Sequence, residues 1–181
     1  MNNQTTIYIG QTKDTTLGNV WVAVTQAGLW ALEYQVPREE FIQSVSRRGP
    51  VAIAENQALT TPVLQEITEY LGGKRKRFTI LIDWSGMSTF QVEVRQAVMN
   101  IPYGQTATYG EIATSLGRPR AARAVGRANA TNPIPLVIPC HRLIGADGSL
   151  RGYGGQGGIQ TKKWLLDFEQ SSLPHAQQEI E

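Results

Sequence analysis

The sequence predicts an α+β protein, with a small sheet in its first half and mainly helices in its second half. Short runs of β-branched and aromatic residues, separated by glycine-containing turns, fill the first third of the chain. Helical patterns with explicit capping signals follow from residue 88 onward. The chain has 181 residues, of which 41% are hydrophobic, and this length allows one domain or two small ones with a real core.

The N-terminal strands are expected at residues 7–9, 20–24 and 29–34. Gly18-Asn19 and Gln26-Ala27-Gly28 separate them, and such turns are typical of hairpins, so the sheet should be antiparallel. A helix is expected over residues 37–47, because proline opens the first turn and acidic residues follow it. A second helix should run over residues 62–71.

A basic run, Lys74-Arg75-Lys76-Arg77, precedes a strand expected at residues 78–82. Four positive charges at a helix-to-strand turn are more often a solvated loop than a nucleic-acid patch, and the sequence alone allows both. A linker is expected over residues 83–87. The predicted domains are therefore 1–86 and 87–170, with a disordered tail over 171–181.

Two capping boxes, Ser88-Thr89-Phe90-Gln91 and Thr108-Tyr109-Gly110-Glu111, predict helix starts in the second half. Gly117 should close the second of these helices, and a further helix should run from Pro119 to Asn129. Two short helices about a glycine-containing turn, the second one basic, form a helix-turn-helix candidate. Spacing alone leaves DNA binding open. A last helix should begin near residue 161.

The net charge of +2 is unevenly distributed, because residues 112–146 contain five arginines and no acidic residue. Cys140 lies inside this window, and a positive field favours both a polyanionic partner and a thiolate. One cysteine cannot form an internal disulfide, and with two histidines it cannot build a Cys/His zinc site. We therefore expect no bound metal and a reducing, cytoplasmic location. No segment approaches the ~20 apolar residues of a membrane helix, so no membrane partner is expected.

Cys140 ends an apolar run and is followed by His141 and Arg142. A free cysteine is mostly thiol at neutral pH, so a nucleophilic cysteine needs a base or a cation nearby. Neighbouring side chains in an extended segment point to opposite sides, so His141 would need a local turn or a bridging water to reach the sulfur. From these three residues alone, a buried structural cysteine is an equally good interpretation.

Five motifs occur in order along the second half of the chain: Arg123-Ala124-Val125-Gly126, Asn132-Pro133, Pro139-Cys140-His141-Arg142, Gly152-Tyr153-Gly154-Gly155 and Lys162-Lys163-Trp164-Leu165-Leu166. Together they resemble the O6-alkylguanine-DNA alkyltransferase family, also called methylated-DNA-protein-cysteine methyltransferases. The resemblance is close over residues 88–169 and looser over 1–86. It implies a ribonuclease-H-like N-terminal domain followed by a winged helix-turn-helix-like DNA-binding domain, and DNA repair without a cofactor.

The resemblance also implies a single-use reaction. Cys140 would accept the alkyl group from guanine O6 by direct displacement, and the resulting thioether has no ordinary route back to a thiol. His141 would act as a base through a water and would be oriented by Glu169. Asn132 would brace the site, and Tyr109 would donate a proton to guanine N3. The residues that the resemblance places around the base are Tyr153 and Pro135 as walls, Gly154 through its amide, Leu143 through its carbonyl, and Lys162.

The implied partner is double-stranded DNA carrying O6-alkylguanine, and activity on O4-alkylthymine is left open. A base inside a duplex cannot reach a buried thiol, so the nucleotide must be flipped out of the stack. Arg123 would fill the vacated space while its helix lies in the minor groove. The further DNA contacts would be the backbone amides of Ala121, Ala122 and Gly126, with Arg118, Arg120 and Arg127 as electrostatic candidates. A monomer is expected, and clustering along DNA is left open.

Two features depart from the family pattern. Arg95 stands where relatives often have tryptophan, and Gln156-Gly157 lengthens the glycine loop, which leaves the tolerance for bulky alkyl groups open. Two other functions remain as alternatives. One is a cysteine hydrolase with a Cys140, His141 and Glu169 triad, which would turn over, and the other is a non-catalytic module that recognises alkylated bases. A SAM-dependent methyltransferase is disfavoured, because no glycine-rich loop follows a strand to open a helix.

Overall fold

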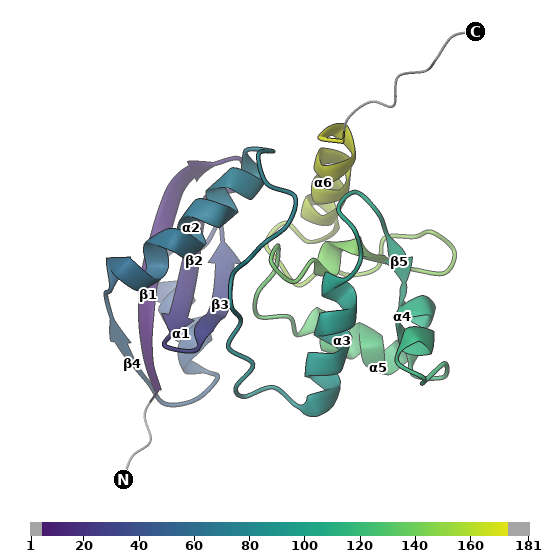
Figure 1. The fold of residues 1–181 in the computed structure, drawn as a ribbon, viewed down its shortest axis with the longest axis horizontal. Coiled ribbons are helices and arrows are strands. Elements are labelled where there is room, and N and C mark those ends of the chain that lie inside the picture. Colours follow the sequence, from purple (N-terminus) through teal and green to yellow (C-terminus); the bar gives the residue numbers. More distant parts are fainter. Residues whose placement is uncertain (1–4, 174–181) are drawn as a thin grey trace, which may run out of the picture.

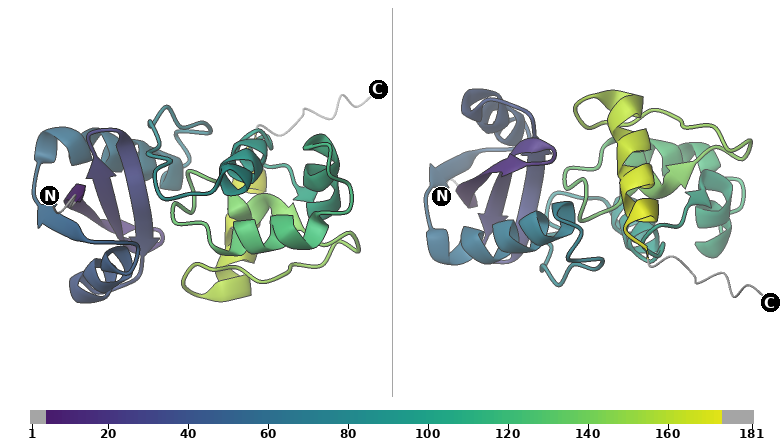
Figure 2. Two further views of the ribbon diagram at one scale, coloured as in Figure 1. Left: turned by 90° about the horizontal axis from the view of Figure 1, so that it is seen from below. Right: turned by 90° about the horizontal axis from the view of Figure 1, so that it is seen from above.

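The computed structural model describes residues 5–173 of the chain. A sheet with two helices lies at one end of the molecule, and the remaining helices lie at the other end (Figure 1). Figure 2 shows the same division from two further sides. The predicted α+β class, with a sheet domain before a helical one, is confirmed.

The N-terminal sheet has four strands in the order β3-β2-β1-β4. Their bounds are Thr5–Thr15 for β1, Gly18–Thr25 for β2, Gly28–Tyr34 for β3 and Val51–Ala54 for β4. The first three strands pair antiparallel, and β4 pairs in parallel with β1. The turn between β2 and β3 is at Gln26-Ala27 as expected, but the turn expected at Gly18-Asn19 is wrong, because these residues already pair in β2 and Thr16-Leu17 form the turn. The sequence did not reveal β4, which is four residues long and half alanine.

Two helices accompany this sheet, α1 (Arg38–Ser46) and α2 (Gln57–Leu71). The prediction for α1 is confirmed within a residue at each end. The predicted start of α2 at Pro62 is wrong, because the side chain of Asn56 caps the helix earlier by accepting from the amide of Ala58. Pro62 lies inside the helix, on an exposed face.

The strand predicted at residues 78–82 is also wrong. This segment meets the sheet only at an isolated bridge between Leu29 and Ile82. The amide of Leu29 donates to the carbonyl of Leu81, and the amide of Asp83 donates to the carbonyl of Leu29. The segment therefore covers part of the open edge of β3, which would otherwise offer unpaired backbone groups. Upstream of it, Arg75 pairs with Glu69 at 2.8 Å, as fits the interpretation of the basic run as a loop.

The helical half contains α3 (Thr89–Met99), α4 (Tyr109–Ser115), α5 (Ala122–Ala130) and α6 (Gly158–Ser171), with short strands β5 (Ala107–Thr108) and β6 (Leu143–Ile144) paired in parallel. Both capping boxes are confirmed, with Ser88 and Thr108 as the caps. Helix α5 begins three residues after Pro119, because Arg118 to Ala121 form a turn first. Helix α6 begins three residues before the predicted position.

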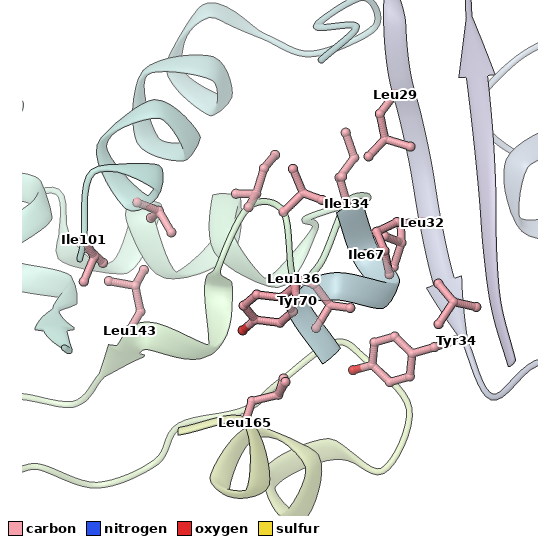
Figure 3. Close-up of a cluster of buried hydrophobic side chains, with 14 of the residues drawn as sticks. Leu29, Leu32, Tyr34, Ile67, Tyr70, Ile101, Ile134, Leu136, Leu143 and Leu165 are labelled. Carbon is pink, nitrogen blue, oxygen red and sulfur yellow. The ribbon is translucent and has the colours of Figure 1, made fainter. Parts of the chain in front are cut away.

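One hydrophobic cluster runs from the sheet into the helical half without a break. Figure 3 shows part of it, with Leu32 and Tyr34 from β3 beside Ile67 and Tyr70 from α2 and Leu136 from the segment before Cys140. A second cluster lies beneath α1, where Trp21 stacks on Phe41. The shared cluster fixes the position of β3 against the segment that leads to Cys140.

Within residues 5–173, no helix is long and apolar enough to cross a membrane. In the same part of the chain, no group of three or more His, Cys, Asp or Glu side chains lies close enough together to hold a metal ion. Of the tail expected to be disordered, Ser171 ends α6, and residues 174–181 lie outside the described residues.

Candidate active site

Cys140 begins a short 3-10 turn, Cys140–Arg142, and only 4% of it is exposed. The apolar run before it is buried, so the turn is held inside the protein. Cys140 lies in the wall of a cavity of about 190 Å³, which Asn132, Pro135 and Gly154 also line. The local turn that a sulfur-to-His141 contact would require is therefore present.

His141 and Glu169 form the centre of the site. His141 Nε2 lies 2.8 Å from Glu169 Oε1, and both side chains are fully buried. Burial would raise the pKa of Glu169, but the hydrogen bonds from His141 and Arg142 outweigh it and hold this pKa at about 2. Because Glu169 is ionised and only accepts, His141 carries its proton on Nε2. Its Nδ1 is then an acceptor, and it has no hydrogen-bond partner among the described residues.

The pKa of His141 is lowered, first by burial, although Glu169 acts in the opposite direction. The imidazole is therefore neutral at neutral pH and can accept a proton at Nδ1. The resemblance implied this pairing of a base with an orienting glutamate. The geometry brings together His141 from the 3-10 turn and Glu169 from α6.

Three further groups fix Glu169, and sequence reasoning assigned none of them to this role. The hydroxyl of Tyr70 donates to Oε1 at 2.5 Å, and the amide of Gly104 donates to Oε2 at 2.9 Å. Arg142 donates through Nη2 to Oε1 at 2.8 Å and through Nη1 to the carbonyl of Ile101 at 2.7 Å. A cation directly after a buried Cys-His pair was the only available signal for Arg142, and nothing local pointed to Tyr70.

The structure corrects the expectation that a positive field makes Cys140 a thiolate. Burial raises the pKa of Cys140, although Asn132 and the charge of Lys162 act against this. Two of the five arginines of the window are paired with carboxylates instead: Arg142 with Glu169, and Arg118 with Glu93 at 2.5 Å on the surface. Cys140 is therefore a thiol at rest, and it needs a base to become a nucleophile.

Asn132 and Arg95 brace the segment beside Cys140. The amide of Asn132 donates to the carbonyl of Ile138 at 2.8 Å. Arg95 is 2% exposed, and its Nη2 donates to the carbonyl of Thr131 at 2.8 Å, at the end of α5. Its Nε and Nη1 have no partner among the described residues. Arg95 is thus a buried anchor for the turn that leads into Asn132.

The pocket residues are arranged around two hollows. Tyr109, Tyr153 and Gly154 line an open groove with Arg123 and Gly126, while Gly154 also lines the cavity that contains Cys140. Burial is the largest cause of the raised pKa of Tyr109, so its hydroxyl keeps its proton. The groove leads along α5 toward the loop that carries Tyr153.

Lys162 and Leu143 contact each other rather than an open pocket. Lys162 is fully buried, and its Nζ donates to the carbonyls of Leu143 at 2.5 Å and Arg151 at 3.1 Å. The carbonyl of Leu143 already accepts one hydrogen bond, so a base would have to use its second lone pair. Lys162 ties the glycine-rich loop to β6.

Helix α5 presents its exposed face to the groove. Arg123 and Arg127 are exposed there, and Arg120 is exposed in the preceding turn. Of the three amides expected to touch phosphate, that of Ala121 already donates to the carbonyl of Arg118, and Gly126 lies inside the helix. Ala122 is in the first turn of α5, where amides lack a partner within the helix.

The fold and the site define a protein with a small N-terminal sheet and a helical half, in which a buried His-Glu pair lies next to a cysteine that lines a cavity. A family model described as the DNA-binding domain of 6-O-methylguanine DNA methyltransferase matches residues 89–171. The inducible methylated-DNA-protein-cysteine methyltransferase of Bacillus subtilis is 42% identical over 164 residues, which cover 87% of this chain and 90% of that protein. The methylated-DNA-protein-cysteine methyltransferase of Salmonella typhimurium is 41% identical over 158 residues, which cover 86% of this chain and 91% of that protein.

Solved structures agree with this result. Mycobacterium tuberculosis OGT in complex with DNA is similar with a TM-score of 0.77 at 34% identity, over 93% of this chain and 96% of that chain. The O6-methylguanine-DNA methyltransferase of Pyrococcus kodakaraensis shares the fold with a TM-score of 0.60 at 23% identity, over 91% of this chain and 98% of that chain. The chain belongs to the methylated-DNA-protein-cysteine methyltransferase family.

Proposed function

We propose that the protein repairs DNA by direct reversal, through irreversible transfer of the alkyl group of O6-alkylguanine to Cys140. The observation that carries this proposal is the arrangement around the sulfur. A buried cysteine lines a cavity, and the next residue is a neutral histidine whose Nε2 is fixed by Glu169 while Nδ1 has no partner among residues 5–173. Such a pair can act as nucleophile and base.

The proposed reaction is a single displacement. The sulfur of Cys140 forms a bond to the alkyl carbon as the bond from that carbon to guanine O6 breaks, and the electron pair goes to the base. The thiol proton passes through a water to Nδ1 of His141, while Tyr109 donates its proton to guanine N3. Asn132 holds the turn before Cys140, and Glu169 stabilises the imidazolium that forms. The product is a thioether, so each molecule reacts once.

Substrate contacts follow from the two hollows. We assign the walls of the base pocket to Tyr153 and Pro135, the amide of Gly154 to guanine O6, and the carbonyl of Leu143 to the exocyclic amine. Lys162 holds the loop that carries these groups. Because the sulfur is buried, the nucleotide has to leave the duplex before it can react.

Helix α5 is the proposed DNA-binding element. Arg123 would enter the base stack from the minor groove, and Arg120 and Arg127 would lie near phosphates with the amide of Ala122. Arg118 would first have to leave its surface pair with Glu93. The groove beside Arg123 leads toward Tyr153 and Gly154, which supports entry of a flipped base from this side.

The test is a stoichiometry experiment. A short duplex with O6-methylguanine labelled on the methyl group is mixed with the protein, and label on protein is compared with the amount of protein. We expect one label per molecule, on Cys140, with the DNA strands intact. Label transfer that survives Cys140→Ala would contradict the proposal, and continued turnover would instead support a cysteine hydrolase. Binding of the duplex without transfer would favour a recognition module.

We further propose a monomer that works in the cytoplasm, where a reducing environment keeps its single thiol free. Sedimentation on a long duplex would show whether molecules cluster along DNA. The same labelling experiment with O4-methylthymine would show whether this base is also a substrate.

A further inference from the structure

Tyr34 ends β3, and its ring projects from the sheet toward the helical half of the chain (Figure 3). The residue is 1% exposed, and its hydroxyl donates a 3.1 Å hydrogen bond to the hydroxyl of Tyr153. A side chain of the N-terminal sheet thus contacts a wall of the proposed base pocket directly.

Gly155 shows how closely the glycine-rich loop approaches Tyr34. A Cβ atom on Gly155 would lie 2.1 Å from the hydroxyl oxygen of Tyr34 and 2.7 Å from Cε1 of Tyr153. No side chain fits there unless one of the two rings moves. The loop backbone is therefore packed against Tyr34, in addition to the hydrogen bond from Tyr153.

The loop depends on such contacts, because residues 145–157 contain neither helix nor strand. Segments without regular structure are held mainly by individual side-chain contacts and are the first to open. Lys162 fixes the start of the loop near Leu143 and Arg151. Tyr34 fixes the next part, at Tyr153 and Gly155.

Tyr34 also bounds the cavity that contains Cys140. Leu32 and Tyr34 of β3 line this cavity together with Val36, which follows the strand, and the loop lines it with Gly154–Gln156. Its volume is about 190 Å³, and an apolar cavity of about 150 Å³ can hold a benzene molecule. Pro135 and Gly154, which we assign to the guanine base, line the same cavity, so the base and its O6 substituent share this space, and the ring of Tyr34 limits the room left for the substituent.

We propose that Tyr34 is a positioning and specificity-determining residue for alkyl transfer. Its hydroxyl holds Tyr153 and the glycine-rich loop in the binding arrangement, and its ring sets the space for the O6-alkyl group beside Cys140. This inference rests on the proposed function, and it gives the N-terminal sheet a direct part in the site.

The test uses two variants, Tyr34→Phe and Tyr34→Ala, with Tyr8→Phe as a matched control in β1. The rate of label transfer to Cys140 is measured in single turnover, from duplexes carrying O6-methylguanine or O6-benzylguanine. Tyr34→Phe loses one hydrogen bond, so both rates should fall about three- to tenfold with an unchanged ratio. Tyr34→Ala enlarges the cavity, so the benzyl-to-methyl ratio should rise at least about fivefold. Tyr8→Phe should react like wild type.

A double-mutant cycle separates loop positioning from a general loss of structure. Tyr34→Phe and Tyr153→Phe remove the same hydrogen bond, so Tyr34→Phe should have little further effect when Tyr153→Phe is already present. If the rate loss of the double variant equals the product of the two single losses, the positioning role is overturned. A Tyr34→Phe rate within twofold of the wild-type rate would overturn it as well. A ratio within twofold of wild type in Tyr34→Ala would overturn the specificity role. If Tyr34→Ala does not fold, the specificity role is tested on the wild-type protein with a larger O6 substituent, naphthylmethyl. A transfer rate equal to that of the benzyl substrate would then overturn the specificity role.

These outcomes differ from a failure of the proposed function. Absence of label on Cys140 in the wild-type protein would remove the proposed function itself. Normal wild-type transfer with insensitive Tyr34 variants would remove only the role of Tyr34.

Discussion

Replacement of Glu169 by glutamine should show how much the buried carboxylate contributes to stability. Oε1 accepts from the hydroxyl of Tyr70, from Nε2 of His141 and from Nη2 of Arg142. Oε2 accepts from the amide of Gly104 at 2.9 Å and from Nε of Arg142 at 3.0 Å. In Glu169→Gln, one of these oxygens becomes an NH₂ group, which donates hydrogen bonds instead of accepting them.

The magnitude follows from the groups left without an acceptor. An NH₂ group at the Oε2 position would face the two donors of Gly104 and Arg142, and each unpaired buried group costs about 1–3 kcal/mol. Arg142 would also lose its counter-charge, and breaking one side of a buried ion pair costs about 3–5 kcal/mol. These estimates describe overlapping losses, so we expect the free energy of unfolding to fall by about 3–5 kcal/mol. For a chain of this length, the melting temperature should fall by roughly 6–20 °C.

The assay is urea and thermal unfolding followed by circular dichroism, with Glu93→Gln as the control. Glu93 also pairs with an arginine, but both side chains are partly exposed, so its loss should change stability little. A loss below about 1 kcal/mol in Glu169→Gln, or one no larger than in Glu93→Gln, would refute the reasoning.

Four further outcomes are expected. The pKa of Glu169 is about 2 in the folded protein and 4.5 in the unfolded chain, so its contribution to stability is complete above pH 4.5 and is lost as pH falls toward 2. The stabilities of wild type and Glu169→Gln in acid unfolding should therefore converge between these two pH values. The lowered pKa of His141 should keep the transfer rate level down to pH 6.5, and a single-turnover rate that already declines above pH 7 would contradict this. Thr108→Ala removes the acceptor for the amide of Glu111 and should cost about 1 kcal/mol in urea unfolding, and unchanged stability would count against the cap. Arg123→Ala should slow duplex repair more than reaction with free O6-benzylguanine, and equal slowing would exclude Arg123 from the base stack.

Sequence reasoning succeeded where the chain makes its contacts locally. Ser88 and Thr108 cap helices whose partners lie three residues away, so the pattern and the contact coincide. The start of α2 shows the limit of this approach. Pro62 suggested the start because proline is common in the first turn, but Asn56 caps the helix before that point and Pro62 lies within it.

The sequence named candidate residues for the site, but it did not predict which charged groups would contact one another there. Tyr70 reaches Glu169 from 99 positions away, and no spacing rule connects them. Arg142 was counted with the positive field around Cys140, but it faces Glu169 instead. Charge counted along the sequence ignores side-chain direction and burial. These two factors decide whether an arginine stabilises the ionised form of the thiol or of a carboxylate.

The unbroken hydrophobic cluster between the sheet and the helical half has a consequence for any attempt to shorten the chain. Leu32 of β3 and Leu136 beside the active-site turn belong to the same cluster, and both are fully buried. A fragment that starts after residue 87 would expose the apolar side chains that now face the sheet. It would need new polar residues on that face to remain in solution. We therefore expect the two halves to unfold together, and a smaller version of the protein would require redesign of the exposed face.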